Sequence, residues 1–224
     1  MSETPRIEDV IEFAENPEPR CPCVLLLDTS GSMQGPPIDA LNEGLMTFKN
    51  DLVKDPLASR RVEVAVITFD NIVNVAQDFI TADKFEPPIL TSQGQTFMGT
   101  AISTALDMVK SRKAHYRASG IAYYRPWIFM ITDGEPHGEP EDSIEQSARR
   151  IAEDEASKRV AFFAVGVEDA NMEKLQTISV RTPVKLIGLN FTDMFLWLSR
   201  STQAVSHSKI DDQVALPPPG WASV

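Results

Sequence analysis

The sequence is poor in the residues that build disulfide frameworks and zinc sites. Its 224 residues include two cysteines, Cys21 and Cys23, and three scattered histidines. Two cysteines separated by one residue are too few and too close to form a disulfide framework. They are typical of a protein in a reducing compartment. No second cysteine pair or histidine cluster completes a zinc site. We interpret both cysteines as structural or inert thiols.

Long apolar runs are also missing. No stretch approaches the roughly 20 apolar residues that a membrane-spanning helix needs. Residues 1–20 are acidic, contain three prolines and lack an apolar core of signal-peptide length. We therefore expect a cytoplasmic protein whose residues 1–20 form an acidic N-terminal arm outside the core.

Positive charge is in short supply. The chain has 21 Lys and Arg against 32 Asp and Glu, which gives a net charge of −11. Such a chain repels polyanions, so neither nucleic acid nor an anionic membrane is an expected partner, whereas metal cations are. A hydrophobic content of 42% suits one folded domain. We place that domain at residues 21–205, followed by a Pro-rich C-terminal tail at 206–224.

What is present is an alternation of apolar runs and helix-like periods. Short apolar runs, typical of buried strands, begin at Val24, Val62, Trp127, Val160 and Val184. Apolar residues spaced by three and four predict helices within residues 38–52, 98–109, 144–151, 172–178 and 194–198.

This order predicts the architecture. A turn at Asp70-Asn71 between two apolar runs predicts a hairpin, hence one antiparallel strand. The fold class is therefore α/β: a Rossmann-like open, mostly parallel sheet with one antiparallel edge strand and helices on both faces.

Three polar clusters fall where strands end or a helix begins. They are Asp28-Thr29-Ser30-Gly31-Ser32, Gly94-Gln95-Thr96 and Thr132-Asp133-Gly134. Each cluster alone is an ordinary turn or helix cap. Because parallel strands end at one edge of a sheet, however, we expect all three clusters to meet there.

The chemistry of these clusters favours Mg²⁺. They offer carboxylates and hydroxyls, which are hard oxygen ligands, and no thiol or imidazole. Ser30 and Ser32 can bind the metal directly, while Asp28 and Asp133 bind through waters or hydrogen-bond the hydroxyls. A Mg²⁺ held mainly by neutral oxygens favours a carboxylate that a partner brings to an open position.

The three clusters, in this order, resemble the metal-ion-dependent adhesion site of von Willebrand factor A (VWA) domains. The resemblance covers roughly residues 21–205 and implies the VWA fold with Mg²⁺, for which Mn²⁺ or Ca²⁺ can substitute. The family's five metal positions fall on Asp28, Ser30, Ser32, Thr96 and Asp133. The family implies that Thr96 binds directly or through a water, depending on conformation.

Three further segments resemble bacterial TerY-like VWA proteins of the tellurium-resistance group. They are Leu25 to Met33, Tyr123 to Trp127 and Phe195 to Ser199, and the closing Pro219-Gly220-Trp221 is similar too. This resemblance implies a stress (tellurite) resistance system. It also implies a protein partner presenting Asp or Glu, such as a phosphatase or kinase-like protein encoded nearby.

Two other functions compete with a binding module. One is a Mg²⁺-dependent phosphohydrolase-like enzyme with Asp28 as nucleophile, but such enzymes place a second Asp where this chain has Ser30. The chain also lacks the P-loop, GxSxG and HExxH motifs. The other is a scaffold with a vestigial site. We expect no catalytic residue and no enzyme.

For three segments the sequence leaves two interpretations open. Glu135 and Glu139 belong to a solvated loop or flank the metal. The basic, aromatic stretch 111–124 packs internally or contacts a partner, since Tyr and Arg are enriched at interfaces. The tail with Trp221 folds back onto the domain or docks elsewhere.

Overall fold

A computed structural model describes residues 7–133 and 135–223 of the chain. Residues 1–6 of the expected arm, Gly134 of the third polar cluster and Val224 of the tail lie outside the described residues. The strands form a single sheet in the order β3-β2-β1-β4-β5-β6-β7. The strands, in chain order, are β1 Cys21–Asp28, β2 Val62–Phe69, β3 Val73–Thr81, β4 Trp127–Thr132, β5 Ala161–Gly166, β6 Val184–Leu186 and β7 Ala222–Ser223.

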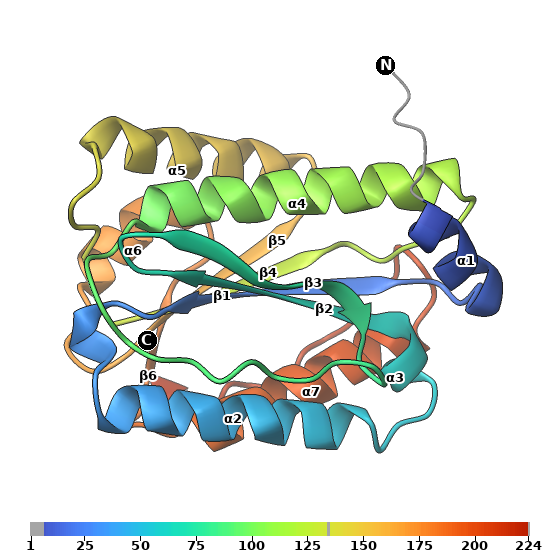
Figure 1. Ribbon diagram of the computed structural model, residues 1–224, viewed down its shortest axis with the longest axis horizontal. Coiled ribbons are helices and arrows are strands. Elements are labelled where there is room, and N and C mark those ends of the chain that lie inside the picture. Colours follow the sequence, from blue (N-terminus) through green and yellow to red (C-terminus); the bar gives the residue numbers. More distant parts are fainter. Residues whose placement is uncertain (1–6, 134, 224) are drawn as a thin grey trace.

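Helices cover both faces of this sheet (Figure 1). Helices α2, α3 and α7 lie on one side, and α4, α5 and α6 lie on the other. The helices are α1 Ile7–Glu15, α2 Pro36–Leu52, α3 Ala58–Arg61, α4 Met98–Ala118, α5 Glu141–Ala156, α6 Met172–Ile178 and α7 Phe191–His207, with a 3₁₀ turn η1 at Gly31–Met33. None of the helices in the described part of the chain combines the length and apolarity needed to cross a membrane.

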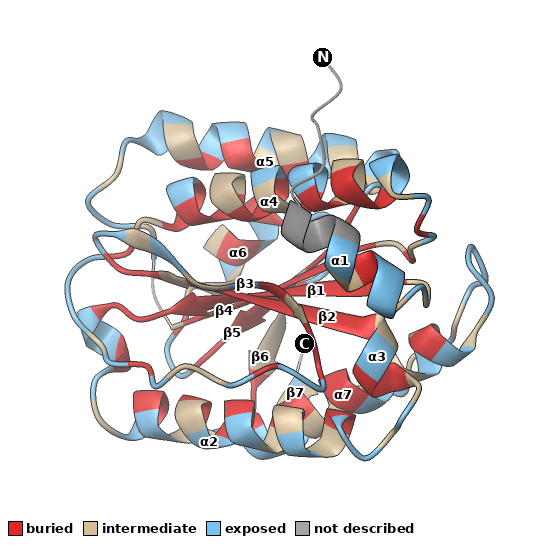
Figure 2. Cartoon of the chain, turned by 45° about the vertical axis from the view of Figure 1, so that its right-hand side comes forward, coloured by how far each residue is buried: buried red, intermediate tan, exposed pale blue. Residues whose placement is uncertain are grey.

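The sheet separates two apolar cores, and Figure 2 shows its central strands buried between the helices. Successive side chains of a strand point to opposite faces. Leu25 and Leu27 accordingly pack toward α2 and α7, while Val24 and Leu26 pack toward α4 and α5. The near-continuous apolar runs of the sequence thus arise from strands buried on both faces.

The predicted fold class is confirmed, with one addition at the edges. β1, β2, β4, β5 and β6 run parallel, and β3 pairs antiparallel with β2 as the hairpin predicts. The short β7 is a second antiparallel strand, paired with β6 at the other edge.

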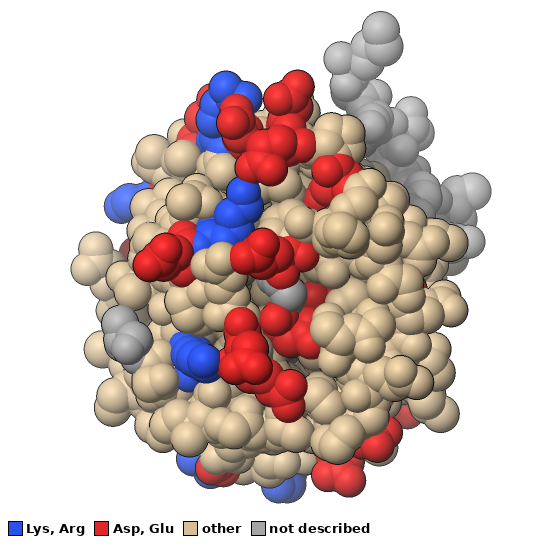
Figure 3. Space-filling model, turned by 90° about the vertical axis from the view of Figure 1, so that its left-hand side faces the viewer, with Lys and Arg blue, Asp and Glu red and all other residues tan. Residues whose placement is uncertain are grey.

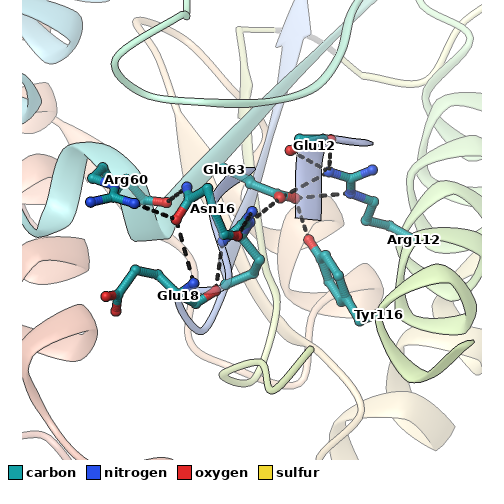
Figure 4. Close-up of polar contacts among 8 residues, drawn as sticks. Glu12, Asn16, Glu18, Arg60, Glu63, Arg112 and Tyr116 are labelled. Atoms are coloured by element: carbon teal, nitrogen blue, oxygen red, sulfur yellow. Dashed lines mark hydrogen bonds and ion pairs between the residues drawn. The ribbon is translucent and has the colours of Figure 1, made fainter. Parts of the chain in front are cut away.

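The N-terminal segment is not the solvated arm that its acidic composition suggests. Within it, Phe13 of α1 and Arg20 are buried. The Nε of Arg20 lies 2.8 Å from Oε1 of Glu63, and both side chains are fully buried. Nε of Arg112 donates to the other Glu63 oxygen at 2.9 Å, and the Tyr116 hydroxyl donates to it as well (Figure 4). The expectation of an arm outside the core is therefore wrong for the end of this segment.

The C-terminal tail folds back onto the domain. The indole of Trp221 is buried, and Nε1 of Trp197 on α7 donates to the carbonyl oxygen of Pro217 at 2.7 Å. The Trp197 and Trp221 rings pack edge to face with their centroids 5.6 Å apart. Of the two interpretations of the tail, the structure supports the first.

The strand order places a crevice at one point of the sheet. The chain leaves β1 toward β2 on one side, and β4 lies on the other side of β1. Such a reversal of strand order opens a crevice at the carboxyl ends of the two strands, where ligands bind in open α/β sheets. Asp28 ends β1 and Asp133 follows β4, so the two carboxylates flank this crevice.

Candidate metal centre

Asp28 is held by hydrogen bonds at the end of β1. Its Oδ1 accepts a hydrogen bond from the backbone N–H of Ser30 at 2.8 Å. Its Oδ2 accepts one from the Thr132 hydroxyl at the end of β4, at 2.5 Å. The side chain is completely buried. Asp28 thus ties together the two strands that flank the crevice and orients the loop that follows β1.

A chain of hydroxyl and carboxyl oxygens continues from this loop. The hydroxyl oxygens of Ser30 and Ser32 lie 3.0 Å apart, and the Ser32 hydroxyl donates to Oδ1 of Asp133 at 2.9 Å. The loop closes into η1, so two serines spaced by one glycine bring their hydroxyls together. Four of the five predicted residues are therefore linked by hydrogen bonds.

Thr96 is brought to the same place through the backbone. The loop before α4 is bonded to the loop after β1, because Gln93 N donates to Thr29 O at 2.8 Å and Gly31 N to Gly94 O at 3.1 Å. Thr96 is buried. Within the described residues no hydrogen bond joins its side chain to the other four predicted residues.

Gly94 must be glycine for this loop to fit. Its φ is +73°, and a Cβ at this position would come within 2.1 Å of Oδ1 of Asn71. Only glycine adopts such a conformation and such a close approach at low cost. The Gly-x-Thr spacing of the second cluster therefore reflects the geometry that carries Thr96.

The segment after β4 also contacts Thr96 through backbone hydrogen bonds. Thr96 and His137 form an antiparallel bridge, with N-to-O distances of 3.2 and 3.0 Å. Two residues further on, the Glu139 carboxylate accepts hydrogen bonds from Gly99 N at 2.6 Å and Thr100 N at 3.1 Å. A carboxylate here satisfies free N–H groups at the start of α4 and suits the helix dipole. Glu139 is thus a helix cap, which neither interpretation of the loop foresaw.

Asp28 and Asp133 are carboxylates without a positively charged partner in the described part of the chain. Burial raises the pKa of Asp28 to about 6, although hydrogen bonds from Ser30 and Thr132 oppose the rise. Burial also raises the pKa of Asp133, and nearby Glu168 adds to the effect. Among the described residues, no Lys, Arg or His forms an ion pair with Asp28 or Asp133. Acidic side chains also gather near the middle of the face that carries this edge (Figure 3).

The donor set fits Mg²⁺. Buried carboxylates are stable when paired with a cation or a metal, and hydroxyl and carboxylate oxygens are the ligands that Mg²⁺ prefers. In the part of the chain that the structure describes, no group of three or more His, Cys, Asp or Glu side chains is arranged for a metal. The hydroxyls of Ser30, Ser32 and Thr96 would therefore have to complete the coordination.

The contacts of two supporting residues, Thr132 of the third polar cluster and Asp70 of the hairpin turn, were not predicted. Thr132 binds Asp28 from the neighbouring strand, and Asp70 accepts the backbone N–H of Phe97 at 2.8 Å on its carbonyl oxygen. The position of Thr132 directly before Asp133 is a usable signal, since both residues leave the same strand. The sequence marks Asp70 as a turn residue but gives no signal for its contact with the loop before α4, because the backbone makes that contact.

Fold and site together define an α/β domain with a hydroxyl and carboxylate cluster at its strand-order switch. The model of the von Willebrand factor type A domain matches residues 23–193. The chain belongs to this family. Its domains often mediate protein–protein interactions, and they are in general adhesion or interaction modules.

A mouse relative, the collagen alpha-5(VI) chain, is 26% identical over 164 residues. The match covers 70% of this chain and 6% of the collagen chain, so this chain spans a small part of that relative.

Solved structures share the fold at low sequence identity. The pilus adhesin SpaC from Lactobacillus rhamnosus GG has a TM-score of 0.62 at 14% identity, over 84% of this chain and 30% of SpaC. The PilB minor pilin from Streptococcus sanguinis has a TM-score of 0.60 at 14% identity, over 83% of this chain and 62% of the pilin. The ArnB paralog VWA2 from Sulfolobus acidocaldarius has a TM-score of 0.54 at 15% identity, over 82% of this chain and 45% of VWA2.

Proposed function

We propose that this chain is a Mg²⁺-dependent protein-interaction module. Asp28, Ser30, Ser32, Thr96 and Asp133 would hold the metal, and Mn²⁺ or Ca²⁺ could replace it. The observation that carries the proposal is the linked oxygen cluster at the switch point, whose two carboxylates have no cation partner within the described residues.

The partner should present an Asp or Glu side chain to the metal. A Mg²⁺ bound largely by neutral hydroxyls retains charge that a further carboxylate can neutralise. Because acidic side chains gather around this edge (Figure 3), that carboxylate should stand within a basic surface. We place this interaction in a cytoplasmic tellurite or stress-resistance system, on the resemblance to TerY-like proteins, with a phosphatase or kinase-like protein as candidate partner.

No observation favours a phosphohydrolase. Asp28 is completely buried, and both of its oxygens already accept hydrogen bonds. The position two residues later is Ser30, which cannot serve as the general acid.

Affinity capture from a lysate, with Mg²⁺ or with chelator, tests the proposal. Wild type should retain a protein only in Mg²⁺, and Ser32→Ala or Asp133→Asn should lose it while keeping the unfolding transition of a folded chain. Ser111→Ala changes an exposed serine on α4, away from the site, and should capture as wild type does. Equal capture by all variants, or capture that survives chelation, would overturn the proposal.

A further inference from the structure

Positive charge gathers in a cavity between α4 and α5, which lie side by side on one face of the sheet (Figure 1). The cavity has a volume of about 560 Å³. Five basic side chains line it against two acidic ones, in a chain whose net charge is −11. The basic residues are Lys110, Lys113, Arg117, Arg150 and Arg159. Lys113 lies 15 residues beyond Met98, the first residue of α4, or roughly 22 Å along the helix from the metal-site end.

Three of these cations belong to one face of α4. Lys110, Lys113 and Arg117 are spaced by three and four residues, so their side chains neighbour one another. The Lys113 ammonium donates to the backbone oxygen of Arg159 at 3.1 Å, and Arg117 donates to the Tyr123 hydroxyl at 3.1 Å. No carboxylate in the described part of the chain forms an ion pair with any of the three.

The other two cations, Arg150 and Arg159, form only partly exposed ion pairs. Arg150 pairs with Asp107 at 2.5 Å, but that carboxylate is 67% exposed. Arg159 lies 3.4 Å from Asp154 and is 64% exposed itself. Exposed pairs of this kind are weak, and each guanidinium keeps further N–H donors free for another acceptor.

Lys113 is a partly buried cation among other positive charges. Burial lowers the pKa of its ammonium, and Arg117 and Arg159 lower it further, while Asp154 opposes them. An anion in the cavity would relieve this repulsion. The stretch 111–124 therefore has two kinds of contact. Tyr116 and Tyr124 are buried inside the domain, while Lys113 and Arg117 line the cavity.

We propose that this cavity binds a compact, multivalent phosphate group, as found in inorganic tripolyphosphate or in the triphosphate of a nucleotide. Lysines bind phosphate as point charges and arginines bind it through paired N–H groups. The volume suits a small ligand, since such sites typically measure about 300–1,000 Å³. A single carboxylate would neutralise only one of the three unpaired cations. A long polyanion such as nucleic acid would meet the repulsion of the whole acidic chain.

Calorimetry with sodium tripolyphosphate tests this site on the full chain, freed of divalent cations on a chelating resin. Without metal, the result does not depend on the proposed function. The triple variant K110Q/K113Q/R117Q should bind about tenfold more weakly than wild type. The control K54Q/K84Q/R200Q removes the same charge from exposed positions away from α4 and α5 and should bind within about twofold of wild type. If the triple variant fails to fold, K110Q alone, at an exposed position, should still weaken binding about threefold.

Competing ligands separate the possible sources of the phosphate. ATP should displace tripolyphosphate. Tighter binding of ATP would assign the site to nucleotides, and equal binding would assign it to the phosphate chain alone; both support the proposal. It is overturned if wild type and the triple variant bind tripolyphosphate equally, or if wild type does not bind it. It is also overturned if a hexaglutamate peptide binds more tightly, which would indicate an acidic protein segment as the occupant.

Discussion

The Ser32 hydroxyl donates a hydrogen bond of 2.9 Å to Oδ1 of Asp133, although 101 positions separate the two residues in the chain. This bond crosses the crevice between the loop after β1 and the end of β4. It joins a predicted neutral ligand to an acidic residue of the same candidate site, as expected of groups that orient metal ligands. The metal-binding interpretation therefore predicts effects at residues on both sides of the crevice.

The glycine at position 94 should be required for metal binding. In Gly94→Ala the new Cβ would clash with Asn71, 2.1 Å away, and displace the loop that carries Thr96. We expect a loss of about 1–3 kcal/mol in stability and weaker Mg²⁺ binding by calorimetry. Gly120→Ala is the matched control, since its φ is also positive at +67° but nothing lies within 4 Å of the added Cβ. Equal Mg²⁺ affinity in both variants would contradict this account of the loop.

Stabilisation by Mg²⁺ should depend on pH. Burial raises the pKa of Asp28 from 3.8 to about 6 in the metal-free chain. An acid whose pKa is raised on folding adds stability below its unfolded pKa, and this stability is lost as the pH rises through 6. Mg²⁺ binds the ionised form, so it should raise the melting temperature more at about pH 7.5 than at about pH 5. Melting curves with and without Mg²⁺ measure this, and an equal rise at both pH values would argue against Asp28.

The buried charges at the opposite end of the sheet should be essential for stability. Glu63→Gln removes the carboxylate that Arg20 and Arg112 share and leaves buried positive charge. Breaking such a pair typically costs about 3–5 kcal/mol. Lys54→Gln breaks an exposed pair with Asp51 and should change the free energy of unfolding by less than about 0.5 kcal/mol. Denaturant unfolding compares the two variants, and similar losses in both would contradict the described role of Glu63.

The cysteines should be unreactive in the folded chain. Both are buried, and burial raises the pKa of Cys21 to about 12 and that of Cys23 still further. Because the thiolate is the reactive form, a disulfide reagent should label neither thiol until the chain unfolds and should then label both. Rapid labelling of the native chain would disprove the interpretation of these residues as inert.

The sequence was most informative where local pattern decides the structure. Buried strands give continuous apolar runs, and parallel strands end at one edge, so the meeting of Asp28, Ser30, Ser32 and Asp133 was predictable. The carboxylate cap that Glu139 forms on α4 was not, because it joins segments 40 positions apart with no periodic signal.

The chain ends were predicted least well, again for a physical reason. Acidic composition made residues 1–20 resemble a solvated arm, yet Arg20 is buried because Glu63, 43 positions away, neutralises it. The strand β7 has two residues and follows three prolines, which disfavour a strand in any local pattern. It pairs with β6 directly after Trp221, which is buried against Phe129 and Trp197. Contacts between residues this far apart in the sequence leave no signal in composition or periodicity.

The measurement that tests the central claim most directly is a calorimetric titration of the metal-free chain with Mg²⁺. The account predicts one saturable site per chain, which is lost in Asp28→Ala and Ser32→Ala and retained in Ser111→Ala, with all variants folded. Absence of saturable binding by the wild type, or equal binding by all four proteins, would contradict the claim that these oxygens form a metal centre.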